Sequence, residues 1–208
     1  MQSATNYSGG LTVNQGVLSY NSLLGLGNST AGGTITLGGG NLSYSGSATV
    51  TIANNATLTA GTTSTLDNAA GTVTYSGIIG GSGNLTKTGA GTLTLSGVNT
   101  YNGTTTVSAG TLATSTADRI SDSSAVTVAS GATFQLGGSE TVGSIAGAGN
   151  YSIGAFTLSA GGDNTSTTHS GSITGAGGAL TKLGSGTLTL NGTNTYNGTT
   201  TKIGRAHV

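Results

Sequence analysis

The chain of 208 residues has no cysteine, proline or tryptophan, and only 5% of its residues carry a charge. Without cysteine, neither a disulfide scaffold nor a thiolate metal site can form. Five basic residues balance five acidic ones, and no basic cluster offers the electrostatic attraction that nucleic acid requires. Aromatic residues are only 4% of the chain. Stability must therefore come from backbone hydrogen bonds and stacked aliphatic side chains.

Long apolar segments are missing as well. No run of 18 apolar residues could cross a membrane as a helix, and residues 1–10 lack the basic and apolar segments of a signal peptide. Disorder is also disfavoured, because disordered chains combine low hydrophobicity with high net charge. Here the net charge is zero and Leu, Val and Ile recur regularly, so we expect an ordered protein.

Glycine, with 40 residues, is abundant, and a long segment occurs twice. Residues 83–106 read GNLTKTGAGTLTLSGVNTYNGTTT, and residues 178–201 read GALTKLGSGTLTLNGTNTYNGTTT. A third, partial copy covers residues 6–18, so Tyr7, Tyr101 and Tyr196 are equivalent positions. Such self-similarity is typical of proteins in which repeated units stack.

Within the repeats, aliphatic residues alternate with threonine, as in TLTL at 92–95. One face of each strand is then apolar and the other hydroxylic. Glycine recurs too often for a helix interior. An antiparallel sandwich is an alternative, but tandem repetition favours stacking. We predict an all-β, right-handed parallel β-helix with essentially no α-helix, in which about ten coils of roughly 20 residues form a rod of about 45 Å.

The segment LTKTGAGTLTLSGVNTYNGTTTVSAGTL at 85–112 closely resembles the passenger-associated transport repeat of autotransporters, and residues 180–201 resemble it as strongly. The positions that carry the resemblance are Leu85, Lys87, Gly89, Gly91, Leu93, Leu95, Gly97, Asn99, Tyr101 and Gly103, with Leu180, Lys182, Gly184, Gly186, Leu188, Leu190, Gly192, Asn194, Tyr196 and Gly198 in the second copy. The resemblance implies a passenger domain of a Gram-negative bacterium. Type V secretion through a carboxy-terminal outer-membrane β-barrel would export it to the cell surface or the medium. It implies no catalytic residue, metal ligand or cofactor.

Residues 1–201 are predicted to form one repetitive β-helix fragment, with strong copies at 83–112 and 178–201. After Thr201 the second copy departs from the first and ends in IGRAHV, which reads as a translated sequencing adapter. We therefore expect residues 202–208 to be a non-native tail. Because both ends fall within the repeat motif, we expect the array to continue beyond them.

A catalytic relay could be read into Asp163, His169 and Ser170. Such a relay needs three converging side chains and an oxyanion hole, and Ser170 lies in no G-x-S-x-G motif. A turn between coils is the favoured interpretation.

The carboxylates Asp67, Asp118, Asp122, Glu140 and Asp163 are scattered along the sequence. A paired-carboxylate site is conceivable at Asp118 and Asp122, which flank Arg119, but Asp and Ser are common in turns. A recurring calcium-binding Asp and a phosphate-binding loop followed by a helix are both missing.

The repeated tyrosines allow two interpretations. They could form an exposed binding stripe, or each could close a corner of the coil while its hydroxyl reaches solvent. We favour the second.

The favoured function is a non-enzymatic, surface-displayed or secreted stalk that supports export, adhesion or aggregation. Self-association and host or surface ligands are its expected partners, through neutral Thr-rich and Asn-rich faces. One alternative is the scaffold of a β-helical surface enzyme whose active site lies outside this fragment. Ice binding is a third, suggested by Thr-x-Thr at 34, 49, 57, 72, 92 and 187. A flat threonine array needs regular spacing, whereas these intervals vary.

Overall fold

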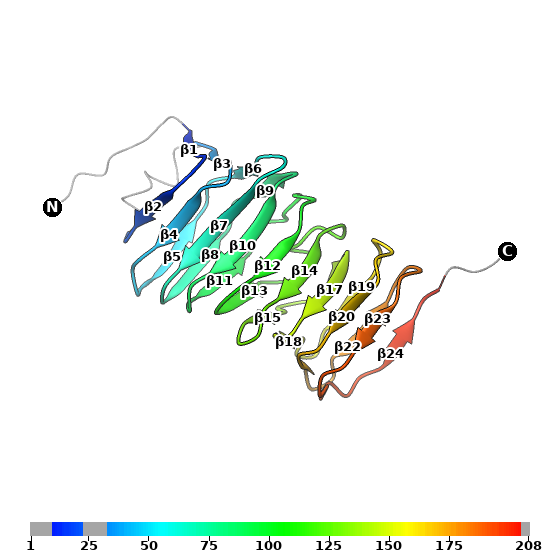
Figure 1. Ribbon diagram of the computed structural model, residues 1–208. Coiled ribbons are helices and arrows are strands. Elements are labelled where there is room, and N and C mark those ends of the chain that lie inside the picture. The colour runs from blue at the N-terminus through cyan, green and yellow to red at the C-terminus, as the bar shows by residue number, and fades with distance from the viewer. Residues whose placement is uncertain (1–9, 23–32, 205–208) are drawn as a thin grey trace.

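The computed structural model describes residues 10–22 and 33–204, in which the chain forms 24 short β-strands and no α-helix. The strands wind in successive coils along one axis, with the first and last described strands at opposite ends (Figure 1). Strands of neighbouring coils pair in parallel. The all-β parallel β-helix predicted from the repeats is thus confirmed.

Sheet B is the longest of the four sheets. Its nine strands, in spatial order, are β2 (Val17–Tyr20), β4 (Asn41–Tyr44), β7 (Thr63–Asn68), β10 (Asn84–Thr88), β12 (Thr105–Val107), β14 (Ala125–Val128), β17 (Ser144–Gly147), β20 (Thr167–His169) and β23 (Leu188–Leu190). Each coil adds one strand, so the described residues make about nine coils. This is slightly fewer than the expected ten, because the first coils are longer than 20 residues: Val17, Asn41 and Thr65 face one another at intervals of 24.

Sheet C forms a second face of the solenoid. Its strands are β5 (Thr49–Ile52), β8 (Thr72–Tyr75), β11 (Thr92–Leu95), β13 (Thr111–Thr114), β15 (Thr133–Gln135), β18 (Asn150–Ser152) and β21 (Ile173–Thr174).

Two four-stranded sheets complete the structure at different heights along the axis. Sheet A contains β1 (Leu11–Val13), β3 (Ile35–Leu37), β6 (Ala56–Leu58) and β9 (Ile79–Gly81). Sheet D contains β16 (Glu140–Val142), β19 (Thr157–Ala160), β22 (Ala179–Lys182) and β24 (Thr200–Lys202). Between sheets A and D along the axis, the segments that precede β12 and β14, residues 96–104 and 115–124, contain no strand.

The core consists of inward side chains stacked from coil to coil. On sheet C one such file is Val50, Val73, Leu93, Leu112, Phe134, Tyr151 and Ile173. All of its members except Val50 are buried. The outward positions of β5, β8 and β11 are threonines. Stacking of apolar on apolar inside and hydroxyl on hydroxyl outside follows from the period-two pattern.

The sequence repeat and the coil do not coincide. Strand β10 of the first strong copy lies in sheet B, whereas its counterpart β22 lies in sheet D. Likewise β11 lies in sheet C and its counterpart β23 in sheet B. The second copy is therefore shifted by one face of the solenoid. Any role of the signature residues must arise from contacts within their own and adjacent coils.

Candidate functional site

The repeat signature occupies a single coil. It begins at Leu85, and the residue paired with Leu85 in the next coil is Thr105, just beyond the last signature residue, Gly103. Leu85, Leu93 and Leu95 are all buried in the core. The signature is thus one complete turn of the solenoid, and its leucines provide the apolar interior.

Lys87 lies inside the solenoid, where a charged residue is unexpected. In sheet B it occupies an inward position between Leu66 and Val107, and its exposed fraction is 0%. Its ammonium group donates hydrogen bonds to the carbonyl oxygens of Thr88 at 2.6 Å, Gly89 at 2.8 Å and Ala109 at 3.3 Å. The side chain therefore joins the turn that follows β10 to the next coil.

Burial lowers the pKa of Lys87 to about 8, although the negative charge of Asp67 acts in the opposite direction. Lys182, the equivalent residue, repeats the arrangement. Its Nζ donates to the carbonyl oxygens of Leu183 and Gly184. In both copies the signature lysine holds the corner carbonyls rather than facing a ligand.

The signature glycines lie where successive coils approach most closely. A Cβ atom at any of them would come within 3.0 Å of an atom of the preceding coil. These residues are Gly89, Gly91, Gly97, Gly103, Gly184, Gly186, Gly192 and Gly198. Gly89 and Gly184 also have φ angles of 75° and 65°, which residues with a Cβ rarely adopt. Coil spacing, not ligand binding, explains the glycine pattern.

Asn99 connects three coils at one corner. Its Oδ1 accepts a hydrogen bond from the Ile79 amide at 2.8 Å, and its Nδ2 donates to the Arg119 carbonyl at 2.7 Å. In the second copy, Asn194 accepts from the Ile173 amide at 2.8 Å. This asparagine supplies hydrogen bonds at a corner where the strand ladder is interrupted.

Tyr101 is fully buried, and its hydroxyl group does not reach solvent. The hydroxyl is 2.7 Å from Thr105 Oγ1, which in turn is 2.9 Å from Ser124 Oγ. Ser124 Oγ donates to the Gly103 carbonyl at 2.7 Å. The corner placement is as expected, but the predicted solvent contact of the hydroxyl is wrong, because buried polar groups pair with one another.

The second copy repeats these contacts with a more open core. Tyr196 OH lies 2.7 Å from Thr200 Oγ1, as in the first copy. Leu188, Leu190 and Tyr196 are only half-buried, because β23 pairs with β20 alone. Residues 6–9 of the partial copy, which include Tyr7, lie outside the described residues.

Asp163, His169 and Ser170 do not form a relay. His169 is fully buried, its ring perpendicular to that of Tyr151 with centroids 4.9 Å apart, and neither imidazole nitrogen has a hydrogen-bond partner within the described residues. Asp163 instead accepts hydrogen bonds from the amide and hydroxyl of Thr165. Burial lowers the pKa of His169. The imidazole is therefore a core side chain packed on Tyr151 rather than part of a relay.

The loop that contains Asp118 and Asp122 is held by Glu140, a residue that no sequence motif connects with it. Arg119 lies between the two aspartates, yet its guanidinium group donates to Thr116 Oγ1 at 2.7 and 2.9 Å. The carboxylate of Glu140, from the next coil, accepts the amide hydrogens of Arg119 and Ile120. The alternation in Glu140–Val142 places Glu140 inward with Val142, and this was the available signal.

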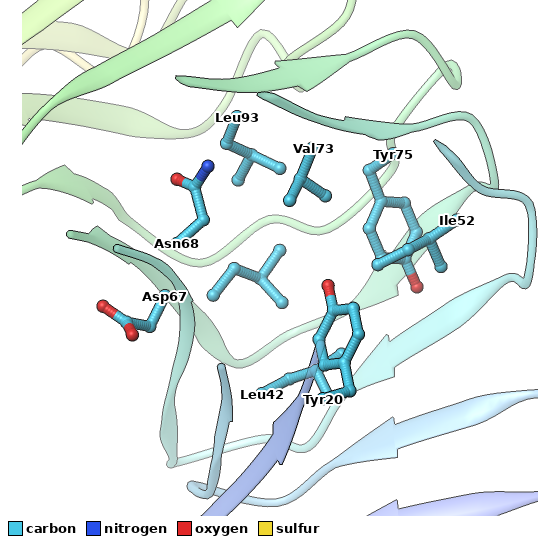
Figure 2. A pocket seen from close by; sticks show the side chains of 9 residues that line it. Tyr20, Leu42, Ile52, Asp67, Asn68, Val73, Tyr75 and Leu93 are labelled. Atoms are coloured by element: carbon cyan, nitrogen blue, oxygen red, sulfur yellow. The ribbon is translucent and has the colours of Figure 1, made fainter. Parts of the chain in front are cut away.

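A small cavity lies among the tyrosines near the amino-terminal end. Tyr20, Leu42, Ile52, Asp67, Asn68, Val73, Tyr75 and Leu93 surround it in Figure 2, together with Leu66. Its volume is about 10 Å³, which is room for about one water molecule. The Tyr75 hydroxyl and Asn68 Oδ1 are buried without a partner in the described structure. The cavity is too small for an organic ligand.

Residues 10–22 and 33–204 contain no helix of the length and apolarity needed to cross a bilayer. The same residues contain no group of three or more His, Cys, Asp or Glu side chains placed to hold a metal ion.

Comparison with known sequences identifies the repeat. The family model of the passenger-associated-transport-repeat matches residues 2–19, 85–113 and 180–203. Searches of curated proteins and of solved structures give no match. The third matched segment ends at residue 203, just beyond β24, in which Lys202 pairs with Lys182. A native boundary at 201 stays a prediction. The chain is a parallel β-solenoid with three segments that match the passenger-associated-transport-repeat, and this combination fits an autotransporter passenger domain.

Proposed function

We propose that this chain is a stalk segment of a surface-displayed or secreted passenger, which an outer-membrane β-barrel exports and which supports adhesion or aggregation. The signature residues support a structural role. The lysine, asparagine and tyrosine bind backbone and side chains of adjacent coils, and the glycines permit close stacking. None of them is free to act on a substrate. We therefore assign no catalytic role to the described repeats.

The observation that carries the adhesive role is the outer face of sheet C. Its seven strands contain no Asp, Glu, Lys or Arg. Five threonines form one outward file in register from coil to coil: Thr49, Thr72, Thr92, Thr111 and Thr133. A hydroxyl can donate and accept, so such a file can pair with a second copy of itself without charge repulsion. Many weak contacts along the rod would add up.

Lysine substitutions on this face test the proposal. We expect Thr72→Lys combined with Thr92→Lys to weaken self-association at least about tenfold, because the new charges repel their counterparts across a self-paired interface. The matched control is Thr86→Lys with Thr106→Lys, on the outward file of sheet B. Sedimentation velocity of the purified chain and clumping of cells that display the complete protein provide the measurements. Equal behaviour of both pairs, or no association of the unmodified chain, would contradict a role of sheet C in aggregation.

Ice binding becomes a second candidate because the irregular sequence spacing of the Thr-x-Thr motifs does not prevent a regular array. Turns of different length take up the differences in spacing, and the motifs at 49–51, 72–74 and 92–94 stack in register. They form two files about 6.6 Å apart with steps of about 4.8 Å, which is a regular grid of hydroxyl groups. Thermal hysteresis of the purified chain distinguishes this function from self-association. Its absence would exclude ice binding without affecting the stalk proposal.

A further inference from the structure

The loop of residues 115–124, between β13 and β14, is held on both sides by side chains of other coils. From the preceding coil, Asn99 donates to the Arg119 carbonyl at 2.7 Å. From the following coil, Glu140 accepts the Arg119 amide hydrogen at 3.0 Å and the Ile120 amide hydrogen at 2.8 Å. Ile120 is buried in the core. Glu140 therefore supplies two of the hydrogen bonds that hold the loop to the following coil.

This support is a buried acid without a cationic partner. Glu140 is 1% exposed. Asp118 and Asp122 add negative charge from the loop, and Tyr101 is the titratable group on the side of the preceding coils. Arg119, which belongs to the same loop, directs its guanidinium group to Thr116 instead. Strand β19, on the other side of β16, contributes no titratable side chain.

The two protonation states of Glu140 therefore differ in how well they fit the docked loop. The carboxylate accepts both amide hydrogens but is a desolvated charge near two other carboxylates. The neutral acid gives up part of the hydrogen bonding and removes that electrostatic cost. Burial, with Asp118 and Asp122, raises the pKa of Glu140 to about 7, against the lowering effect of the two amides.

We propose that Glu140 is a proton-controlled latch, which keeps the loop of residues 115–124 docked when it is protonated and loosens the loop when it ionises. In the undocked loop, water surrounds the carboxyl group, and its pKa returns to the ordinary value of 4.5. Because the docked pKa is the higher one, the extra stability of the docked loop is complete below pH 4.5. It is lost as the pH rises through about 7.

Hydrogen exchange of individual amides measures the latch directly. After correction for the intrinsic pH dependence of exchange, we expect the opening constant at the Arg119 and Ile120 amides to rise roughly 100-fold between pH 5 and pH 8. The Ile78 amide is a matched internal control, because the uncharged side chain of Asn55, which makes no hydrogen bond to the loop, holds it at a comparable distance of 2.9 Å. Its opening constant should not change with pH.

A variant separates Glu140 from other titrating groups. Glu140→Gln should abolish the pH dependence at Ile120. If this variant does not fold, Asp122→Asn should lower the midpoint of the transition, because it removes one of the charges that raise the Glu140 pKa. The proposal is wrong if opening at Ile120 is the same at pH 5 and pH 8, if Ile78 shows the same change, or if neither variant alters the profile.

Discussion

Gly97→Val should lower the free energy of unfolding by about 3 kcal/mol or more, one of the largest effects of a single substitution in this chain. A Cβ atom at Gly97 would collide with the backbone carbonyl of Gly77 in the preceding coil. Backbone held in a strand ladder cannot move away as a flexible side chain could. Thermal unfolding, followed by circular dichroism, should show a melting temperature about 6 to 12 °C lower.

The matched control is Gly162→Val. A Cβ atom at Gly162 meets no atom within 4 Å, and the residue is exposed. Its melting temperature should stay close to that of the unmodified chain. If both variants lose the same stability, close approach of the coils does not explain the glycine pattern.

Lys87→Met should destabilise the fold by about 2 kcal/mol. The substitution preserves the aliphatic volume but removes the donors for the carbonyl oxygens of Thr88, Gly89 and Ala109. Each hydrogen bond to a charged group contributes about 1.5 to 3 kcal/mol, and removal of the buried charge offsets part of the loss. Chemical denaturation measures the difference. Lys202→Met is the control, because Lys202 is exposed.

The pH dependence gives the Lys87 prediction a second readout. Burial lowers the pKa of Lys87 from 10.5 to about 8, so the folded chain loses this proton at a lower pH than the unfolded chain. The free energy of unfolding should therefore rise as the pH increases from about 8 to about 10.5. This rise should disappear in Lys87→Met. A stable variant with an unchanged pH profile would show that Lys87 is solvated rather than buried.

The architecture was predictable because the period-two alternation and the tandem repeat are properties of the sequence itself. The same alternation contains the position of Lys87. In LTK at 85–87, an inward Leu85 requires an inward third residue. The charge of lysine concealed this, since buried lysines are rare without partners. The hydrogen-bond partners of Lys87 are backbone carbonyl groups, and no pattern of side chains in the sequence indicates them.

Features that depend on the number of residues in each turn between strands could not be predicted. The regular file that includes Thr72, Thr92 and Thr111 arises although the sequence intervals differ. The shift of the second copy by one face has the same origin, because the number of residues per coil varies along the rod. The contact of Glu140 with the Ile120 amide likewise joins different coils. Tertiary register, rather than local pattern, determines all three.

A distance measurement along the rod tests most directly whether the coils stack in parallel and in register. Spin labels on cysteines introduced at Thr51 and Gln135, four coils apart in register, should be separated by about 19 Å between their Cα atoms; for Thr51 and Thr174, six coils apart, the separation should be about 29 Å. The absence of native cysteine makes the labelling unambiguous. Parallel coils stacked in register should give two narrow distributions whose means differ by about 10 Å. Equal means or distributions without a maximum would contradict a stack of parallel coils in register.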